Sequence, residues 1–163
     1  MTSVTEMADV LREEVAWQKT PELLELSDYE KLIINAIKRL FIDTGRASQF
    51  SASMIHPKET ESDETTEEDT ETESDEATSP EIIIDYDFMI DEERYVFLCA
   101  QIGFLKRVQL DVNNIVSYTT NALSITSADK PYAHLQDSIA ELEKERRIVY
   151  YKMVRYTIYS AGE

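Results

Sequence analysis

The chain contains few of the residues that mark tight turns or bind metals. With 3 Gly and 4 Pro among 163 residues, it has little turn chemistry, which disfavours a many-stranded sandwich or barrel and favours long helices. A single Cys excludes an internal disulfide framework and a thiolate metal cluster. Because 2 His cannot complete a zinc site by themselves, we expect neither a structural metal nor a cofactor.

Long apolar runs are missing too. No stretch approaches the ~18 apolar residues of a transmembrane helix. The opening residues, MTSVTEMADV, lack the basic region followed by an apolar region that identifies a signal peptide. We therefore expect a soluble, intracellular protein that does not bind a membrane.

Acidic residues outnumber basic residues by 33 to 16, and the excess is concentrated in one segment. Residues 59–81 contain twelve Asp and Glu, no Lys or Arg, and Ala77 as the single hydrophobic residue. Such a segment cannot bury apolar surface and repels itself, so we predict a long, disordered acidic insertion. The net charge of −17 also disfavours a nucleic-acid-binding face, which needs clustered Lys and Arg.

Several roles remain open for this acidic insertion. Acidic residues alternate from Asp69 to Asp75, as in some calcium sites, but the sharp glycine turn and the bidentate Glu of such sites are missing. Ser62 and Ser74 are followed by acidic residues and could accept phosphate. The insertion could also repel DNA or acidic neighbours, or be a solvated loop that costs the fold little entropy.

The residues before the insertion predict two helices. Ser3 and Glu6 have the spacing of a capping box and precede a short helix that should end near residues 20–21. A second capping box begins at Ser27 and predicts a helix over 28–44, with a glycine stop directly after it. Residues 46–56 are predicted as a loop or a short helix. The apolar positions at helical spacing are Met7, Leu11 and Val15 in the first helix, and Tyr29, Ile33, Ala36, Ile37, Leu40 and Phe41 in the second.

The residues after the insertion begin with an apolar, β-branched run at 82–84, which predicts a short strand. Asp91 should cap a helix with an acidic first turn. Gly103 inside that helix costs about 1 kcal/mol relative to Ala, which close approach of a neighbouring helix would explain. Residues 111–118 either prolong this helix or begin another, and 121–126 predict a turn and a short strand. The buried stripe comprises Tyr95, Leu98, Cys99, Ile102 and Leu105.

A long helix should follow from about residue 130 to the middle 150s. Apolar residues recur in it at alternating intervals of four and three, with Arg146 as the one charged member. Since the pattern lasts only about three heptads, it favours a bundle core over a free coiled coil. We call these apolar residues the packing ridge of the subunit: Leu135, Ile139, Leu142, Val149 and Met153.

The chain end combines tyrosines with cations, a composition typical of interface anchors. The β-branched Thr157 and Ile158 slightly favour an extended docking tail over tyrosines that reach out from a bundle core. The docking residues on this interpretation are Tyr150, Tyr151, Arg155, Tyr156 and Tyr159.

Together these patterns predict a mostly α protein: a small helical bundle with a long terminal helix, one or two short strands at most, and the acidic insertion. Residues 1–58 and 82–147 form two helical parts of one domain, separated by the acidic loop at 59–81. Residues 148–163 form the end of the long helix and the docking tail.

No arrangement of residues indicates an enzyme. His134 has Asp137 and Ser138 close by on a predicted helix, but such a pair is more often a surface contact than a catalytic base. His56 has no partner in the sequence, and Cys99 falls in an apolar stripe, which predicts an inert buried thiol. A glycine-rich phosphate loop is impossible with so few glycines.

The order of segments resembles a known family. A helical pair and a long insertion precede DEERYVFLCAQIGFLKRVQLD and then VSYTTNALSITSADKPYAHLQDSIAELEKERRIVYYKMVRY. This order resembles the head–tail connector, or neck adaptor, proteins of tailed bacteriophages, mainly over 27–56 and 82–160. The long acidic insertion departs from that pattern.

The resemblance implies a structural protein of the virion neck that is assembled in the host cytoplasm. It implies a homo-oligomeric ring of about a dozen copies that binds the portal protein and a downstream neck or tail protein. DNA would pass through the channel without specific binding. The alternative is an intracellular helical adaptor or regulator whose acidic loop mimics nucleic acid or binds a basic partner, and a helical enzyme is the third class.

Overall fold

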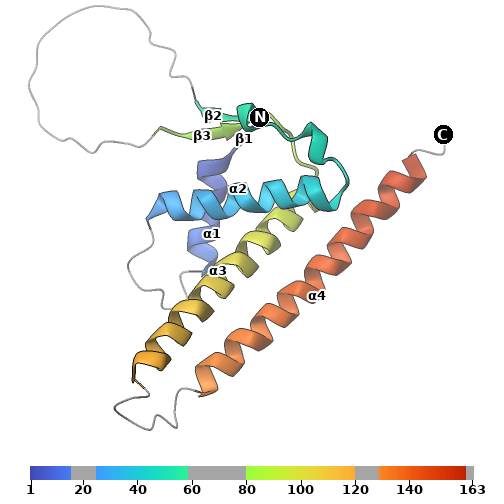
Figure 1. The fold of residues 1–163 in the computed structure, drawn as a ribbon. Coiled ribbons are helices and arrows are strands. Elements are labelled where there is room, and N and C mark those ends of the chain that lie inside the picture. The colour runs from blue at the N-terminus through green and yellow to red at the C-terminus, as the bar shows by residue number, and fades with distance from the viewer. Residues whose placement is uncertain (16–24, 59–79, 120–128, 161–163) are drawn as a thin grey trace, which may run out of the picture.

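The computed structural model describes the backbone of residues 1–15, 25–58, 80–119 and 129–160, and the side chains of these ranges except 111–119, 129–133 and 156–160. The described part contains four α-helices and one small antiparallel sheet (Figure 1). The prediction of a mostly α protein with a long terminal helix is confirmed. Nearly all of the acidic insertion, and the strand predicted at 121–126, lie outside the described residues.

Three short strands form the sheet at one end of the helices: β1 (Thr2–Ser3), β2 (Ile55–Pro57) and β3 (Ile82–Ile84). The central strand β3 pairs antiparallel with both of the others. It confirms the strand predicted at 82–84, whereas the expectation of one or two strands is wrong by one. β1 is two residues long and β2 contains a proline, so neither has the alternating pattern that identifies a strand in a sequence.

Contacts at the sheet join the two ends of the acidic segment 59–79. The backbone N–H of Lys58 donates to the carbonyl oxygen of Glu81 at 2.7 Å, and the Lys58 ammonium lies 2.9 Å from the Glu81 carboxylate. The Thr5 hydroxyl accepts a hydrogen bond from the N–H of Ile82 at 2.9 Å. The pairing of β2 with β3 therefore closes the base of the insertion.

The first helix, α1 (Val4–Val15), begins where the capping box predicts. The Ser3 hydroxyl oxygen accepts a hydrogen bond from the N–H of Glu6 at 3.1 Å, which satisfies one of the free N–H groups of the first turn. The helix buries the face predicted from its periodicity, including Met7, Leu11 and Val15.

The second helix, α2 (Leu26–Asp43), starts two residues before the predicted range of 28–44. Its N-cap residue, Glu25, makes no side-chain cap, so the capping box predicted at Ser27 is wrong. The predicted stop is confirmed: Gly45 has a φ of 72°, the left-handed conformation that commonly ends helices.

Residues 46–56, predicted as a loop or a short helix, contain both short helices and a strand. Two 3₁₀-helices, η1 (Ala47–Gln49) and η2 (Ala52–Met54), lead directly into β2. Phe50, between the two, packs against Phe41 of α2 with ring centroids 5.5 Å apart. This contact fixes the connecting segment to the core.

The third and fourth helices are long and run in opposite directions: α3 (Ile90–Thr119) leads away from the sheet, and α4 (Asp129–Ser160) returns beside it (Figure 1). α3 continues through 111–118 rather than beginning a new helix there. α4 continues to residue 160, so the preference for an extended tail is wrong for 148–160. Each residue added to an existing helix gains a hydrogen bond, which outweighs the weak propensities of β-branched residues.

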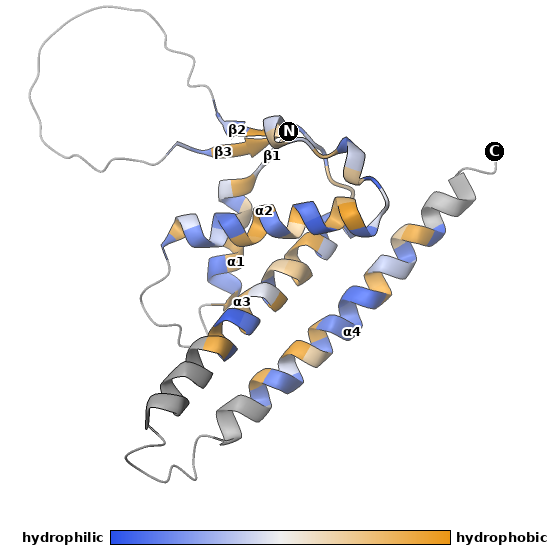
Figure 2. Ribbon diagram, in the orientation of Figure 1, coloured by the Kyte–Doolittle hydropathy of each residue, from blue (hydrophilic) through white to orange (hydrophobic). Residues whose placement is uncertain are grey.

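The core lies between α1, α2 and α3, and α4 covers one side of α3. Figure 2 shows hydrophilic and hydrophobic residues alternating along α4, as expected of a helix with one buried face. A Cβ added at Gly103 of α3 would lie 3.3 Å from Leu32 Cδ2, which confirms the close helix approach predicted there. The largest fully buried side chains are Phe41, Phe104, Leu11, Ile33, Ile37, Leu40 and Ile84.

Candidate functional site

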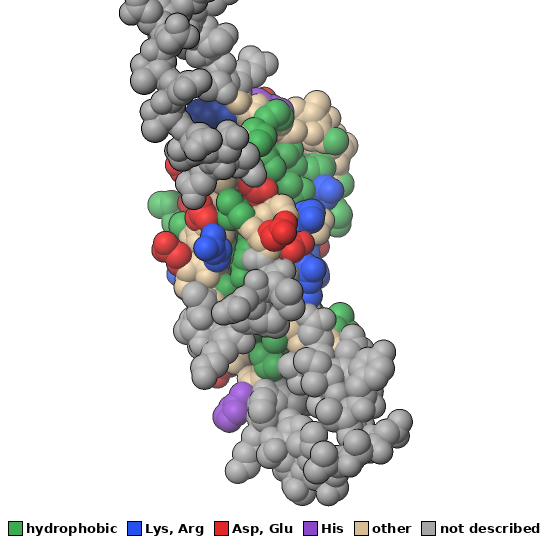
Figure 3. Space-filling model, turned by 90° about the vertical axis from the view of Figure 1, so that its left-hand side faces the viewer, with side chains coloured by type: hydrophobic (Ala, Val, Ile, Leu, Met, Phe, Trp, Pro, Cys, Tyr) green, Lys and Arg blue, Asp and Glu red, His purple; other side chains and the backbone are tan. Residues whose placement is uncertain are grey.

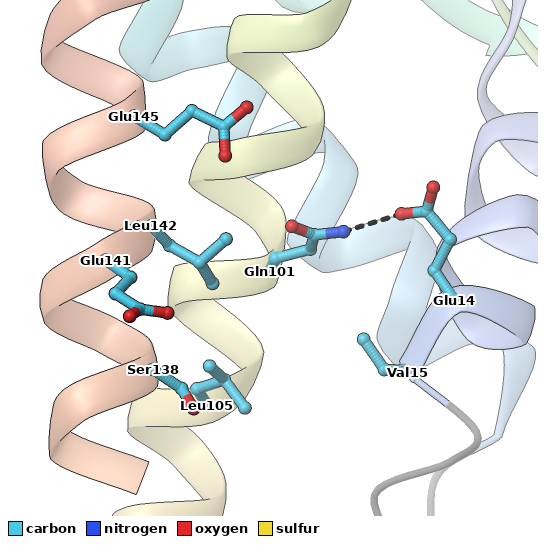
Figure 4. Close-up of a pocket in the computed structure, with 8 residues that line it drawn as sticks. All are labelled: Glu14, Val15, Gln101, Leu105, Ser138, Glu141, Leu142 and Glu145. Atoms are coloured by element: carbon cyan, nitrogen blue, oxygen red, sulfur yellow. Dashed lines mark hydrogen bonds between the residues drawn. The ribbon is translucent and has the colours of Figure 1, made fainter. Parts of the chain in front are cut away.

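An open groove lies on α3, between the end of α1 and the middle of α4 (Figure 4). Its volume is about 290 Å³, and a second hollow of about 510 Å³ continues it toward the start of α3. We call the two together the acidic groove. Its lining residues are Glu14 and Val15 of α1; Ile90, Glu93, Arg94, Phe97, Leu98, Gln101 and Leu105 of α3; and Ser138, Glu141, Leu142 and Glu145 of α4.

The walls of the acidic groove carry more negative than positive charge. Four carboxylates and one guanidinium line it. The Arg94 guanidinium pairs with Glu145, and the Glu14 carboxylate accepts a hydrogen bond from Gln101 Nε2 at 2.6 Å. Within the part of the chain that the structure describes, Glu93 and Glu141 form no ion pair. The groove therefore combines apolar side chains with two carboxylates, Glu93 and Glu141, for which the described residues supply no ion-pair partner.

The side of α4 that faces away from α3 forms a second surface. Ile148 and Tyr151 on this side are 51% and 65% exposed, large values for apolar side chains. Three cations share the side with them, and in the described residues none of the three has an ion-pair partner. The intervals of three and four residues place the whole set on one helix face. We call this set the outer face: Lys144, Arg147, Ile148, Tyr151 and Arg155.

The packing ridge lies on the opposite side of α4. Ile139, Val149 and Met153 are buried. Leu135 and Leu142 are partly buried against the core, and Leu142 also lines the acidic groove. The ridge therefore packs against α3 of the same chain.

The predicted docking residues have different surroundings. The Tyr150 hydroxyl donates to the carbonyl oxygen of Asp43 at 3.2 Å, and its ring lies 6.4 Å from that of Tyr95, so Tyr150 joins α4 to α2 and α3. Tyr151 and Arg155 are exposed on the outer face. Tyr156 and Tyr159 lie in α4, and their side chains are outside the described residues.

An ion pair with a buried carboxylate, which the sequence did not indicate, joins α3 to the segment that follows α2. Glu92, 6% exposed, lies with Oε1 2.5 Å from Arg46 Nη2 and with Oε2 3.0 Å from the Tyr86 hydroxyl. Its carboxylate also accepts the N–H of Met89 at 3.2 Å, so Glu92, rather than the predicted Asp91, caps α3. Burial lowers the pKa of Arg46, but hydrogen bonds and charge from Glu92 outweigh it, and the pKa is raised.

Cys99 lies in a second polar cluster between α2, α3 and α4. The Tyr95 hydroxyl donates to the Asp43 carboxylate, and Arg146 of α4 lies near both Tyr95 and Cys99. Burial raises the pKa of the Cys99 thiol, and the charge of Arg146 only partly offsets it. A neutral thiol is a poor nucleophile, so the geometry supports the interpretation of Cys99 as a structural residue.

The described side chains show no constellation suited to metal binding. In these ranges no three His, Cys, Asp or Glu come together as a metal site would require, and every buried side-chain nitrogen and oxygen has a hydrogen-bond partner. Figure 3 shows histidine side chains at opposite ends of the face it displays. His56 Nε2 lies 3.1 Å from Asp85 Oδ2, within hydrogen-bond distance. No helix of the described ranges is long and apolar enough to cross a membrane.

Comparison with protein-family models, curated proteins and solved structures finds no match to this chain. The functional argument therefore depends on the two surfaces: the acidic groove and the outer face of α4. Both combine exposed apolar groups with an excess of charge of one sign, a composition found in protein-binding surfaces.

Proposed function

We propose that the protein is a structural assembly subunit. The observation that carries the proposal is the position of α4: its packing ridge is covered by α3, while its outer face leaves Ile148 and Tyr151 more than half exposed. Exposed apolar groups rimmed by charge are typical of surfaces that bind another protein.

In its finer form, the proposal is a ring-forming connector of a tailed-phage neck. The resemblance noted in the sequence supports this assignment, with the portal protein and a downstream neck or tail protein as partners. DNA would pass through the ring without specific binding. An acidic insertion that faced such a channel would repel phosphates and let the genome slide.

The alternative function is an adaptor that binds a basic partner through the acidic insertion. It is favoured by the closed base of the insertion, where the Lys58–Glu81 contacts and the β2–β3 pairing hold the two ends of the segment together. A segment displayed in this way presents concentrated negative charge to a cationic surface.

Native mass spectrometry of the purified chain, alone and mixed with portal rings from the same genome, distinguishes the two functions. The connector predicts a closed oligomer of one size, either alone or on the portal. The adaptor predicts a monomer that binds a basic protein in a fixed ratio, through the insertion. A chain that stays monomeric in both samples contradicts the connector.

A further inference from the structure

We propose that the outer face of α4 of one copy docks in the acidic groove of a second copy. This contact rests on the proposed assembly function and names the surfaces through which the subunits join. The outer face is Lys144, Arg147, Ile148, Tyr151 and Arg155, and the groove lies between α1 and α4 over α3.

Charge complementarity supports this occupant. The five residues of the outer face include three cations, and Glu141 of the groove lies one turn before Lys144 on the same side of α4. The groove is lined by four carboxylates and one guanidinium. In the described residues Glu93 and Glu141 of the groove, and Arg147 and Arg155 of the outer face, all lack an ion-pair partner. Joining the two surfaces brings opposite charges together, which directs encounter and fixes the orientation of the partners.

Apolar groups on both surfaces complete the match. Ile148 and Tyr151 project from the outer face, and the groove has an apolar floor that includes Phe97 and Leu142, with Ile90 86% exposed at one end. Burying an exposed aliphatic or aromatic side chain is the main favourable term in association. The two surfaces thus have the apolar centre and charged rim of a protein interface.

The contact joins two different surfaces, so it builds either a two-fold pair that exchanges both contacts or a head-to-tail chain of subunits. If two outer faces met each other, Lys144, Arg147 and Arg155 of one copy would oppose the same cations of the other, which is unfavourable. The groove and the outer face are different surfaces of one subunit, so every subunit can donate one and receive another. Repetition of such a contact produces a ring where the rotation closes and an open filament where it does not.

Charge reversal tests the contact. In the first variant Arg147→Glu is combined with Arg155→Glu, and in the second Glu93→Lys is combined with Glu141→Lys. Each variant opposes like charges and should weaken self-association by about 100-fold or more in sedimentation at low salt. All four substitutions on one chain restore opposite charges and should restore the oligomer. The control, Lys31→Glu with Lys38→Glu on the exposed side of α2, has the same charge change as the first variant and should assemble normally.

The outcomes separate this contact from the proposed function. If wild type forms a closed oligomer and both reversal variants do so too, the contact is wrong and the assembly function stands. If the reversal and rescue results hold but wild type forms open chains without a size limit, the contact stands and the ring is wrong. A wild-type chain that is monomeric at every concentration overturns the contact, and portal binding then tests the function alone. Circular dichroism of each variant excludes unfolding as the cause of lost assembly.

Discussion

Glu92→Ala should lower the free energy of unfolding by about 3–5 kcal/mol, the usual cost of breaking a buried ion pair. The Glu92 side chain is 8% exposed and that of Arg46 29%. Truncation leaves the guanidinium with the Tyr86 hydroxyl, 2.7 Å away, and with no carboxylate. It also removes the acceptor of the Met89 N–H at the start of α3, so the loss includes a helix cap worth about 1 kcal/mol.

Two companion variants are compared with Glu92→Ala. One separates the contribution of the Glu92 charge from that of its helix cap, and the other measures the loss of an ion pair that is less buried. Glu92→Gln keeps an acceptor for the cap and removes the charge, so we expect a loss of about 1–3 kcal/mol. Glu143→Ala breaks the pair with Lys106, which spans 2.8 Å. Neither of these two side chains is buried, since they are 51% and 32% exposed, so the loss should be less than about 1 kcal/mol.

Urea unfolding followed by circular dichroism measures all three variants. In a domain of this size each 1 kcal/mol corresponds to about 2–4 °C in Tm, so thermal melts provide a second reading. If Glu92→Ala loses no more stability than Glu143→Ala, the ion pair is screened by solvent and the argument from burial is refuted.

Three further predictions concern the packing ridge, the thiol and the insertion. Ile139→Ala removes a side chain that is 8% exposed and should lower the free energy of unfolding by about 2–5 kcal/mol. Ile148→Ala on the outer face should change it by less than about 0.5 kcal/mol. Equal losses in urea unfolding would contradict this assignment of the two sides of α4. Burial raises the pKa values of Cys99 and Tyr95, so the unfolded chain releases these protons at lower pH than the folded chain. The free energy of unfolding should therefore fall as the pH rises above about 8.5. The thiol of the folded protein should react with a disulfide reagent only on unfolding. A rapid native reaction contradicts the buried thiol. Replacing residues 59–79 by a short Gly/Ser linker should leave Tm unchanged or raise it, since the closed base remains and self-repulsion is removed, and a fall of more than about 5 °C would show that the segment supports the fold.

The helices were predictable because their signals are local and periodic. In α2 the apolar residues recur every three or four positions, and Gly45 supplies the left-handed stop. The packing ridge of α4 follows from the same periodicity, and three of its five members are buried. The end of α4 was predicted less well, since weak β propensities there are overridden by the hydrogen bond that each added helical residue gains.

The remaining features depend on residues far apart in the sequence. Arg46 and Glu92 are joined by tertiary packing, and no spacing rule connects them. A glutamate in the first turn of α3 was read as a favourable charge for the helix dipole, and only the structure shows its guanidinium partner. The acidic groove is likewise invisible in the sequence, because it consists of the parts of α1, α3 and α4 that the other helices leave uncovered.

Measuring the mass of the assembled protein tests the central claim most directly. Native mass spectrometry of the wild-type chain, alone and with portal rings from the same genome, should show a closed oligomer of one size, and the chain carrying Arg147→Glu and Arg155→Glu should not form this oligomer by itself. A wild-type chain that remains a monomer in both samples would contradict the assignment of this protein as an assembly subunit.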